Sequence, residues 1–375
     1  MWSRRWGPAG SRVLFNGAIM DVVTAAVELP WLGMPIWVWA GFIGVVLALL
    51  AFDLGVLHGK PHEITVRESV IQSSIFVGLG WLFSVVVGLI YFNADPATLR
   101  DPQLASLADP AVRAWHAAQL YLTGLLVEQS LSIDNIFVIS LVFGYFAVPR
   151  RYQHRVLFWG ILGVIVMRGL MIAGGAALLT HFHWVLYVFG AFLLFTGLKM
   201  LFMVGEEPDI ANNVVLKVLK RRMRVTDQLH DERFFVTAPD KRTGKLVRHA
   251  TPLFLALAVI EFIDLVFAVD SVPAVFAITQ EPFIVYTSNI FAILGLRSLY
   301  FALAAMVHRF HYLKYALALV LVFIGAKIFL SGWIGKFPSE LSLGVTLALL
   351  AGGVLFSLWR TKVSGASHEA PTRGQ

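Results

Sequence analysis

Six carboxylates interrupt long apolar stretches of this sequence, and they are the first candidates for chemistry. A charged side chain at the centre of a membrane costs on the order of 2.5–3.5 kcal/mol on insertion scales. A protein that used its apolar segments only as structure would rarely retain so many such groups. We therefore expect these acids to bind cations or protons: Asp53, Glu128, Asp134, Glu261, Asp264 and Asp270.

Four of these acids form two pairs with the same spacing. In each pair the second acid follows six residues after the first, and a polar residue comes next. Residues six apart lie about 120° apart on an unbroken helix, so one acid of a pair can face a shared axis while the other meets an arginine. The first acid and the final polar residue share a helix face. The two sets are Glu128, Asp134 and Asn135, and Asp264, Asp270 and Ser271.

Basic side chains within the apolar stretches are fewer than the acids. Arg168 and Arg297 lie near the middle of their stretches, and we expect them to form structural ion pairs with the acids. Lys199 and Lys327 lie near the ends, where a long side chain can reach the interface. One interpretation is that the acids only form ion pairs with these four basic groups. Two central arginines for six acids instead favour a further cation.

The ligand types narrow the nature of that cation. Carboxylate, amide and hydroxyl oxygens suit hard divalent ions such as Mn²⁺, Mg²⁺ or Ca²⁺. The chain has no cysteine, which excludes thiolate metal sites and thiol redox chemistry. Pro273 cannot donate to the carbonyl of Val269, so that oxygen is a further ligand or the proline only kinks the helix. The predicted metal ligands are Asp134, Asp270, Glu128, Asp264, Asp53, Asn135, Glu261 and Ser271.

The elements that must position these residues are membrane-spanning helices. Of the 375 residues, 58% are hydrophobic and 14% are charged, and the mean hydropathy is +0.75. Apolar runs of roughly 20 residues match the length of a transmembrane helix. The sequence predicts an all-α, polytopic transmembrane bundle over residues 36–359. Its nine spans are expected at 36–57, 70–92, 118–147, 156–179, 184–204, 252–278, 283–307, 312–330 and 341–358.

An internal repeat relates residues 118–204 to residues 252–330. Each copy contains an acid pair, then a central arginine, then a helix opened by Phe-His-aromatic, as at Phe182 and Phe310. Three spans per copy is an odd number, so the second copy enters the membrane from the opposite side. Inverted three-helix repeats around a midplane site are typical of secondary transporters.

Basic residues orient the predicted spans. Most of the 30 Lys and Arg fall in connections on one side, whereas the other side has Arg100, Arg113 and Lys336. The positive-inside rule then places the amino terminus outside and the carboxyl terminus inside. Residues 1–35 are an exception to this rule. Part of this segment would lie upstream of the true start if Met20 is the initiator. A tail at 360–375 is expected to be disordered.

The connection at 205–251 is expected on the cytoplasmic side. Its Val214, Val215, Val218 and Leu219 alternate with basic residues, which predicts an amphipathic surface helix, and a hairpin is expected around 239–244. Two interpretations stay open, a positive patch facing lipid and a regulatory or partner-binding loop. The net charge of +7 comes mostly from such connections, and no nucleic-acid-binding pattern is present.

Several segments resemble the TerC family of membrane proteins. They are the segments 128–138 and 261–273, the segment 287–297, Phe234-Phe-Val in the inner connection and Asp53-Leu-Gly-Val in the first span. The resemblance runs from about Trp37 to Trp359 and is greatest to the subgroup of alkali-induced manganese exporters. It implies a multi-pass protein of the bacterial inner membrane, in a family named for tellurium resistance. The acidic site argues against tellurite itself as the substrate.

Three functions compete at this stage. The first is a non-enzymatic transporter that exports Mn²⁺ or a similar ion in exchange for protons, within the lipid bilayer and with no resident cofactor. The second is a membrane protein of stress response or membrane-protein assembly that binds metal without moving it. The third, an intramembrane aspartyl hydrolase, lacks the Gly-x-Gly-Asp expected beside one aspartate. The sequence leaves the oligomeric state open.

Overall fold

The computed structural model describes residues 30–53, 65–182, 184–202, 210, 213–226, 228–239, 246–304, 313–334 and 339–366. Helices dominate these ranges, and the strands form only two short antiparallel ribbons. Many large apolar side chains remain exposed on the helices, such as Leu82 at 63%, Leu170 at 66% and Phe195 at 67%. A surface of this kind suits lipid rather than water. The predicted class, an all-α membrane protein, is confirmed.

A helix lies over each of the nine expected spans. Judged on the described residues, four of them are both long and apolar enough to cross a membrane: α3, α6, α7 and α9. Shorter apolar stretches lie within α2, α10, α11 and α12. The number of crossings therefore stays a prediction. The helices are α2 (Ile36–Phe52), α3 (Val66–Asn93), α5 (Pro110–Tyr145), α6 (Arg150–His181), α7 (Val185–Phe202), α9 (Pro252–Phe276), α10 (Pro282–Ala304), α11 (Leu313–Ile334) and α12 (Ser339–Ala366).

Two helix boundaries differ from the prediction. Helix α5 starts eight residues before the expected span, because Asp109 caps Ala111 and Val112 and Pro110 occupies the first turn. Helix α12 continues to Ala366, so the predicted disordered tail does not begin at residue 360. Residues 1–29 and 367–375 lie outside the described part of the chain.

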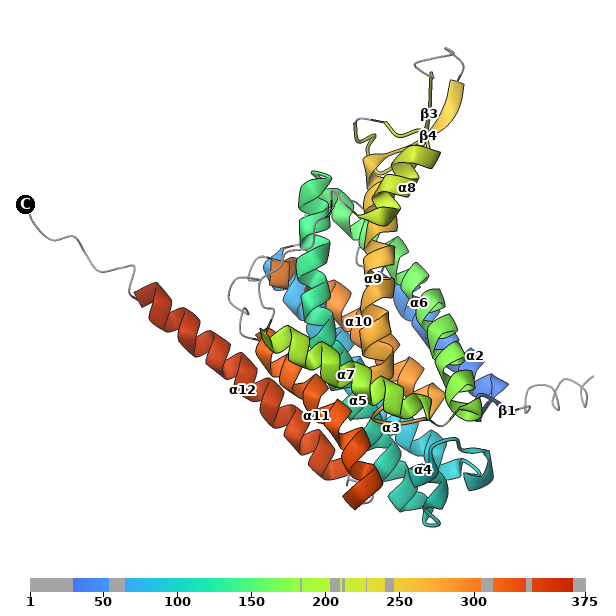
Figure 1. The fold of residues 1–375 in the computed structure, drawn as a ribbon. Coiled ribbons are helices and arrows are strands. Elements are labelled where there is room, and N and C mark those ends of the chain that lie inside the picture. The colour runs from blue at the N-terminus through green and yellow to red at the C-terminus, as the bar shows by residue number, and fades with distance from the viewer. Residues whose placement is uncertain are drawn as a thin grey trace, which may run out of the picture.

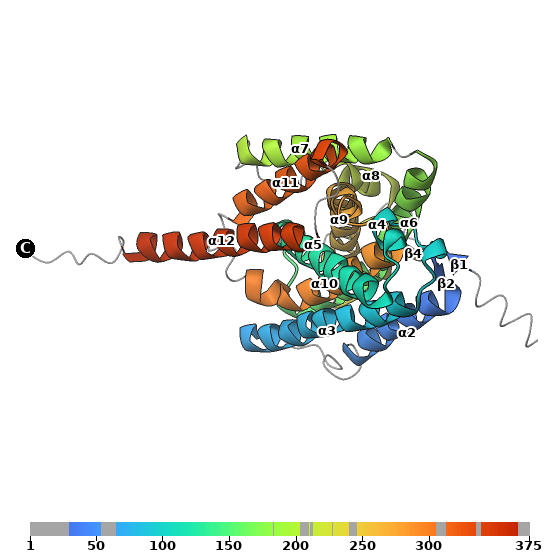
Figure 2. The same cartoon turned by 90° about the horizontal axis from the view of Figure 1, so that it is seen from below.

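The helices form layers around a central group (Figure 1). Helices α5, α9 and α10 lie in the middle, between α7 and α11 on one side and α2 and α3 on the other (Figure 2). Helix α3 packs on α5 and α10, α6 packs on α9, and α12 lies along α11 and α5. The acid-bearing helices α5 and α9 thus belong to the central group, which is where a polar site needs to be.

The two ends of the bundle differ. At one, termed here the α8 end, lie α8 (Val214–Arg222) and the ribbon of β3 (Phe235–Pro239) with β4 (Leu246–Ala250). The pairing of Phe235 with Ala250 confirms the predicted hairpin, whose tip lies outside the described residues. At the other, the α4 end, lie β1 (Pro30–Trp31), β2 (Met34–Pro35), η2 (Pro96–Thr98) and α4 (Pro102–Ser106).

Helix α8 confirms the predicted surface helix but presents a different side to the protein. Leu216 is buried at 1% exposure, and Leu219 packs beside it. Val214 and Val218, expected on the apolar face, are 66% and 52% exposed. Contacts to α9 decide this orientation, because α8 packs on that helix.

Helices α7 and α11 cross closely and reciprocally. A Cβ atom at Gly197 would lie 2.8 Å from the carbonyl oxygen of Ala318, and one at Gly325 would lie 2.8 Å from that of Gly190. The same sequence offset separates Gly197 from Gly325 and Gly190 from Ala318. A twofold relation between the two copies would produce such a crossing. The inverted repeat itself stays a prediction.

Gly197→Ala or Gly325→Ala should destabilise the protein by about 1–3 kcal/mol, because the new methyl group meets the backbone of the facing helix. Gly174→Ala is the matched control, since its Cβ would meet nothing within 4 Å. Thermal unfolding of the purified variants in detergent measures the difference. Equal midpoints for Gly197→Ala and Gly174→Ala would contradict the close crossing.

Candidate functional site

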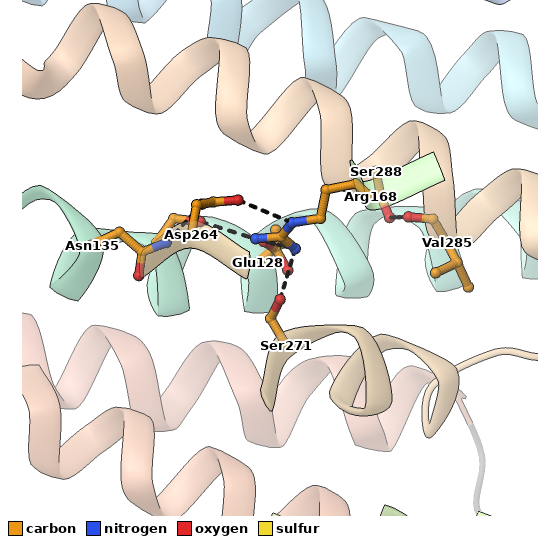
Figure 3. Close-up of polar contacts among 8 residues, drawn as sticks. Glu128, Asn135, Arg168, Asp264, Ser271, Val285 and Ser288 are labelled. Atoms are coloured by element: carbon orange, nitrogen blue, oxygen red, sulfur yellow. Dashed lines mark hydrogen bonds and ion pairs between the residues drawn. The ribbon is translucent and has the colours of Figure 1, made fainter. Parts of the chain in front are cut away.

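Arg168 of α6 is the centre of the buried polar site. Its side chain is 1% exposed. Nη1 donates to Glu128 Oε1 over 2.7 Å and to Ser271 Oγ over 2.7 Å, and Nε lies 3.6 Å from Asp264 Oδ2 (Figure 3). Glu128 belongs to α5, and both Ser271 and Asp264 belong to α9. One guanidinium therefore joins three helices in the middle of the bundle.

Weaker polar contacts extend this cluster. Asn135 Nδ2 donates to Asp264 Oδ1 over 3.5 Å, which links α5 to α9 a second time (Figure 3). Ser132 Oγ donates to Glu128 Oε1 over 3.5 Å. The structure thus brings together Glu128, Asn135, Asp264 and Ser271 of the predicted ligands, around an arginine predicted to be structural.

A cavity of about 70 Å³ lies beside the cluster on the side of the α8 end. Helices α5, α6, α9 and α10 all contribute to its lining. Three polar side chains of the cluster reach it, those of Ser132, Asn135 and Asp264. This space, termed here the central cavity, has room for a few water molecules next to a carboxylate.

Glu261 is a further acid close to the cluster. It lies one helical turn before Asp264 on α9, and its carboxylate packs directly against the backbone of α6 at Gly163. A side chain at Gly163 would occupy the same space, so the glycine is what lets the acid fit there. Gly160, one turn earlier, allows the same approach.

Several buried polar atoms of this region have no hydrogen-bond partner among the described residues. They include Glu128 Oε2, Glu261 Oε1 and Arg168 Nη2. Buried polar groups are nearly always satisfied, so unpaired carboxylate oxygens indicate space for water or a cation. The donor set, made of carboxylate, amide and hydroxyl oxygens, fits a hard divalent ion.

The acids of the cluster contact the arginine and are not arranged around a metal ion. Within the described residues, no three His, Asp or Glu side chains gather as a metal site would require. Arg168 supplies the positive charge between Glu128 and Asp264. A divalent ion would have to replace this guanidinium to be held by both acids.

Other predicted ligands lie elsewhere or outside the description. Asp270 has Lys199 of α7 as its charged neighbour, although Ser271 beside it contacts Arg168. Asp53 caps the end of α2 near the α8 end, 4.0 Å from His154 Nε2. The side chains of Asp134 and Arg297 lie outside the described part. Helix α9 continues through Pro273 to Phe276.

The two predicted copies share one arginine. The spacing predicts that one acid of each pair meets an arginine while the other faces the axis. Arg168 contacts the first acid of both copies, Glu128 and Asp264. The rotation of α9 about its axis decides this, since it turns Asp264 and Ser271 toward α6 and leaves Asp270 toward α7.

Sequence reasoning missed a second buried acidic cluster, at the α4 end. Glu281 is 0% exposed and accepts from the backbone N–H groups of Arg100 and Asp101 and from the Tyr91 hydroxyl. Asp101 accepts from Thr279 Oγ1 over 2.7 Å and from the N–H of Gln280. Each acid directly precedes a proline, a pattern that is common at the start of a helix. This pattern is the only sequence signal for the cluster, and it does not indicate that the two acids lie close together.

Arg113 completes this end of the bundle. Its buried guanidinium donates to the backbone carbonyl groups of Tyr91, Phe92, Ala94 and Leu107. The interactions tie the end of α3 to the connection that leads into α5. Together with Glu281, they hold the loops at this end in a single arrangement.

Comparison with known proteins identifies relatives across most of the chain. The pattern described as Integral membrane protein TerC family matches residues 113–365. An uncharacterized membrane protein of Rickettsia bellii is 43% identical over 87% of this chain and 98% of its own length. A protein of Escherichia coli K12 with the provisional name membrane-bound redox modulator Alx is 42% identical over 87% of this chain and 95% of its own. A protein of Myxococcus xanthus, described as uncharacterized membrane protein STKORF319, is 40% identical over 89% of this chain and 95% of its own length. No solved structure matches.

Stability should depend on pH through Glu281. Burial raises the pKa of this carboxyl from 4.5 to about 7, and the negative charge of Asp101 acts in the same direction. The folded state then binds a proton that the unfolded state has lost between these values, so the free energy of unfolding should fall as pH rises through this window, by at most about 3 kcal/mol, and level off above it. Glu281→Gln should remove this dependence in thermal unfolding scans.

Glu232→Gln, on the surface of the 205–251 connection, is the control for that measurement. It should leave the pH dependence unchanged, because Glu232 is partly exposed and pairs with Arg155. An unaltered pH profile in Glu281→Gln would show that Glu281 is not the titrating group.

Arg168→Met should destabilise the protein by about 3–5 kcal/mol, because Glu128 would remain buried without a partner. The double variant Arg168→Met/Glu128→Gln should recover much of the loss. Arg155→Met breaks an exposed ion pair and should cost about 0–1 kcal/mol. Detergent unfolding measures all three, and an Arg168→Met variant as stable as Arg155→Met would contradict a structural role for the arginine.

Proposed function

Because this chain belongs to the TerC family of integral membrane proteins, we propose that it is a secondary transporter that exports a hard divalent cation, most naturally Mn²⁺. The observation that carries the proposal is the meeting of Glu128 and Asp264 at Arg168 in the centre of the bundle. These acids come from the two predicted repeats, and a binding site at the repeat interface is where such transporters hold their substrate.

The chemistry of the cluster supports an ion of this class. Asp264, Asn135 and Ser132 line the central cavity and offer carboxylate, amide and hydroxyl oxygens. Glu128 and Glu261 each keep a buried oxygen without a hydrogen-bond partner among the described residues. Oxygen donors without sulfur favour Mn²⁺, Mg²⁺ or Ca²⁺ over soft metals.

Arg168 would act as the internal substitute for the ion. With the site empty of metal, its guanidinium neutralises Glu128 and Asp264, which could not remain ionised together in a buried site without it. As an ion is taken up, the two acids would release Arg168 and turn their oxygens to the metal. Exchange of one cation for another keeps the buried charge balanced through the cycle.

Protons are the proposed coupling ion. A divalent cation and protons compete for the same carboxylate oxygens, so metal binding should release protons and tighten as pH rises. Protons that enter from the outside would then displace the metal at the outer face. An inward proton gradient would in this way drive metal export.

The proposed setting is the inner membrane of a bacterium, with the α8 end in the cytoplasm. The basic residues of α8 lie at this end and include Lys217, Lys220 and Arg221. The positive-inside rule places such residues on the cytoplasmic face. The relatives named above are also bacterial membrane proteins.

A second function is favoured because Arg168 occupies the position between the two acids. Arg168 already fills the space between the two acids, and within the described residues no three acids or histidines are arranged to hold a metal. A static ion pair of this kind suits a membrane protein of stress response or membrane-protein assembly that binds metal without moving it. The redox role in the provisional name of the Escherichia coli relative could not use thiols here, because this chain has no cysteine.

Transport by purified protein in proteoliposomes separates the two functions. We expect flux of Mn²⁺ above that of Mg²⁺ and Ca²⁺, driven by an imposed pH gradient at clamped membrane potential. Glu128→Gln and Asp264→Asn should lower the flux at least about tenfold, since each removes a charged ligand worth more than about 1.4 kcal/mol. Asp134→Asn, Asp270→Asn and Asp53→Asn test the remaining predicted acids.

Glu232→Gln serves as the matched control, because it removes a carboxylate at the surface. Its flux should equal that of the unaltered protein. Binding of Mn²⁺ without any flux would support the non-transporting function, and flux that ignores the pH gradient would remove the proton coupling while leaving an acidic pathway.

A further inference from the structure

Tyr300 separates two cavities that lie in series. The central cavity of about 70 Å³ reaches Asp264 and Asn135, as described above. A second cavity of about 270 Å³ lies at the α8 end, against the connection between α5 and α6, and is lined by Ser140, Arg150 and Gln153 among others. Tyr300 of α10 lines both cavities. We call the second cavity the vestibule.

The order of the residues along the helices places the cavities on one line. On α5, Glu128 and Asn135 come before Ser140, and α5 ends at the α8 end. At a rise of about 1.5 Å per residue, Ser140 lies roughly 18 Å beyond Glu128 toward that end. From the α8 end toward the middle of the bundle, the order is therefore the vestibule, Tyr300, the central cavity and the acids at Arg168.

Aromatic packing holds the Tyr300 ring in place. The residue is 3% exposed. Its ring meets that of Phe143 edge-on with centroids 5.7 Å apart, and that of Phe301 with centroids 5.0 Å apart. Ser140 of α5 lines the vestibule together with Tyr300. Phe143 also lines the vestibule, so the ring is fixed from that side.

We propose that Tyr300 is the gate between the vestibule and the cation site. A packed aromatic ring closes the path and excludes the water that would accompany an ion, which makes it a barrier to passage. Its rotation into the vestibule would open the way to Asp264 and Asn135. The vestibule has space for the ring beside Gly144, where a Cβ atom would meet nothing within 4 Å. What passes the gate rests on the function proposed above, whereas the gate itself rests on the two cavities.

Cysteine labelling tests the gate without requiring transport. The chain has no cysteine, so a single introduced thiol is the only one that can react. Val164→Cys places the thiol in the central cavity, and Gly144→Cys places it in the vestibule. The probe is a small, positively charged, membrane-impermeant methanethiosulfonate, applied to reconstituted full-length protein from each side of the membrane in turn.

From the side on which Gly144→Cys reacts, Val164→Cys should react slowly while Tyr300 is present. Adding Tyr300→Ala should accelerate labelling of Val164→Cys about tenfold, which corresponds to removing a barrier of roughly 1.4 kcal/mol. Tyr300→Phe keeps the ring and should retain most of the protection. Labelling of Gly144→Cys should be the same with and without Tyr300→Ala.

A second variant covers the case in which Tyr300→Ala fails to fold. Phe143→Leu leaves Tyr300 intact but removes the ring that packs on its edge, and it should also accelerate labelling of Val164→Cys. The gate is refuted if Val164→Cys reacts as fast as Gly144→Cys with both rings present, or if neither variant changes its rate. If labelling of Val164→Cys depends on Tyr300 but the protein moves no metal, the gate is supported and the transport function is refuted. If the protein moves metal but labelling does not depend on Tyr300, the transport function is supported and the gate is refuted.

Discussion

The buried guanidinium of Arg168 is the interaction on which the central structure depends. It stands 1% exposed between Glu128 of α5 and Asp264 of α9, and neither acid could remain charged there without it. The same group therefore sets the depth and rotation of three helices relative to one another. In a lipid environment no water can compensate a misplaced charge, so this constraint is stronger than it would be in a soluble protein.

The rest of the bundle supports this centre in two different ways. At the α4 end, Glu281 and Arg113 bind backbone N–H and carbonyl groups of the connections, and they fix the loops. On the flank, α7 and α11 pack through glycines, where van der Waals contact between backbones replaces polar bonds. Around the vestibule at the α8 end, Gln153 donates to the backbone carbonyl of Val148, and the rings of Phe143, Tyr300 and Phe301 line the same space.

The ion pairs of Arg168 with Glu128 and Asp264 bear on both proposed functions, transport of metal and binding of metal without transport. A resident cation makes the empty site stable, and the same cation must leave for a metal to bind. Whether the protein transports then depends on the free-energy difference between these two states, which the acids, the amide of Asn135 and the hydroxyl of Ser271 jointly set.

The sequence alone determined the helices and the chemical types of the site. Apolar runs of about 20 residues have few stable alternatives to a membrane helix, and the spacing of Glu128 and Asn135 places both on one face whatever surrounds them. Only the tertiary structure decided which groups meet. Arg168 contacts Asp264 from the other predicted copy, Asp270 faces Lys199, and Tyr300 lies between two cavities. These outcomes depend on the rotation of each helix about its axis, which packing against several neighbours fixes and which the pattern of a single helix does not contain.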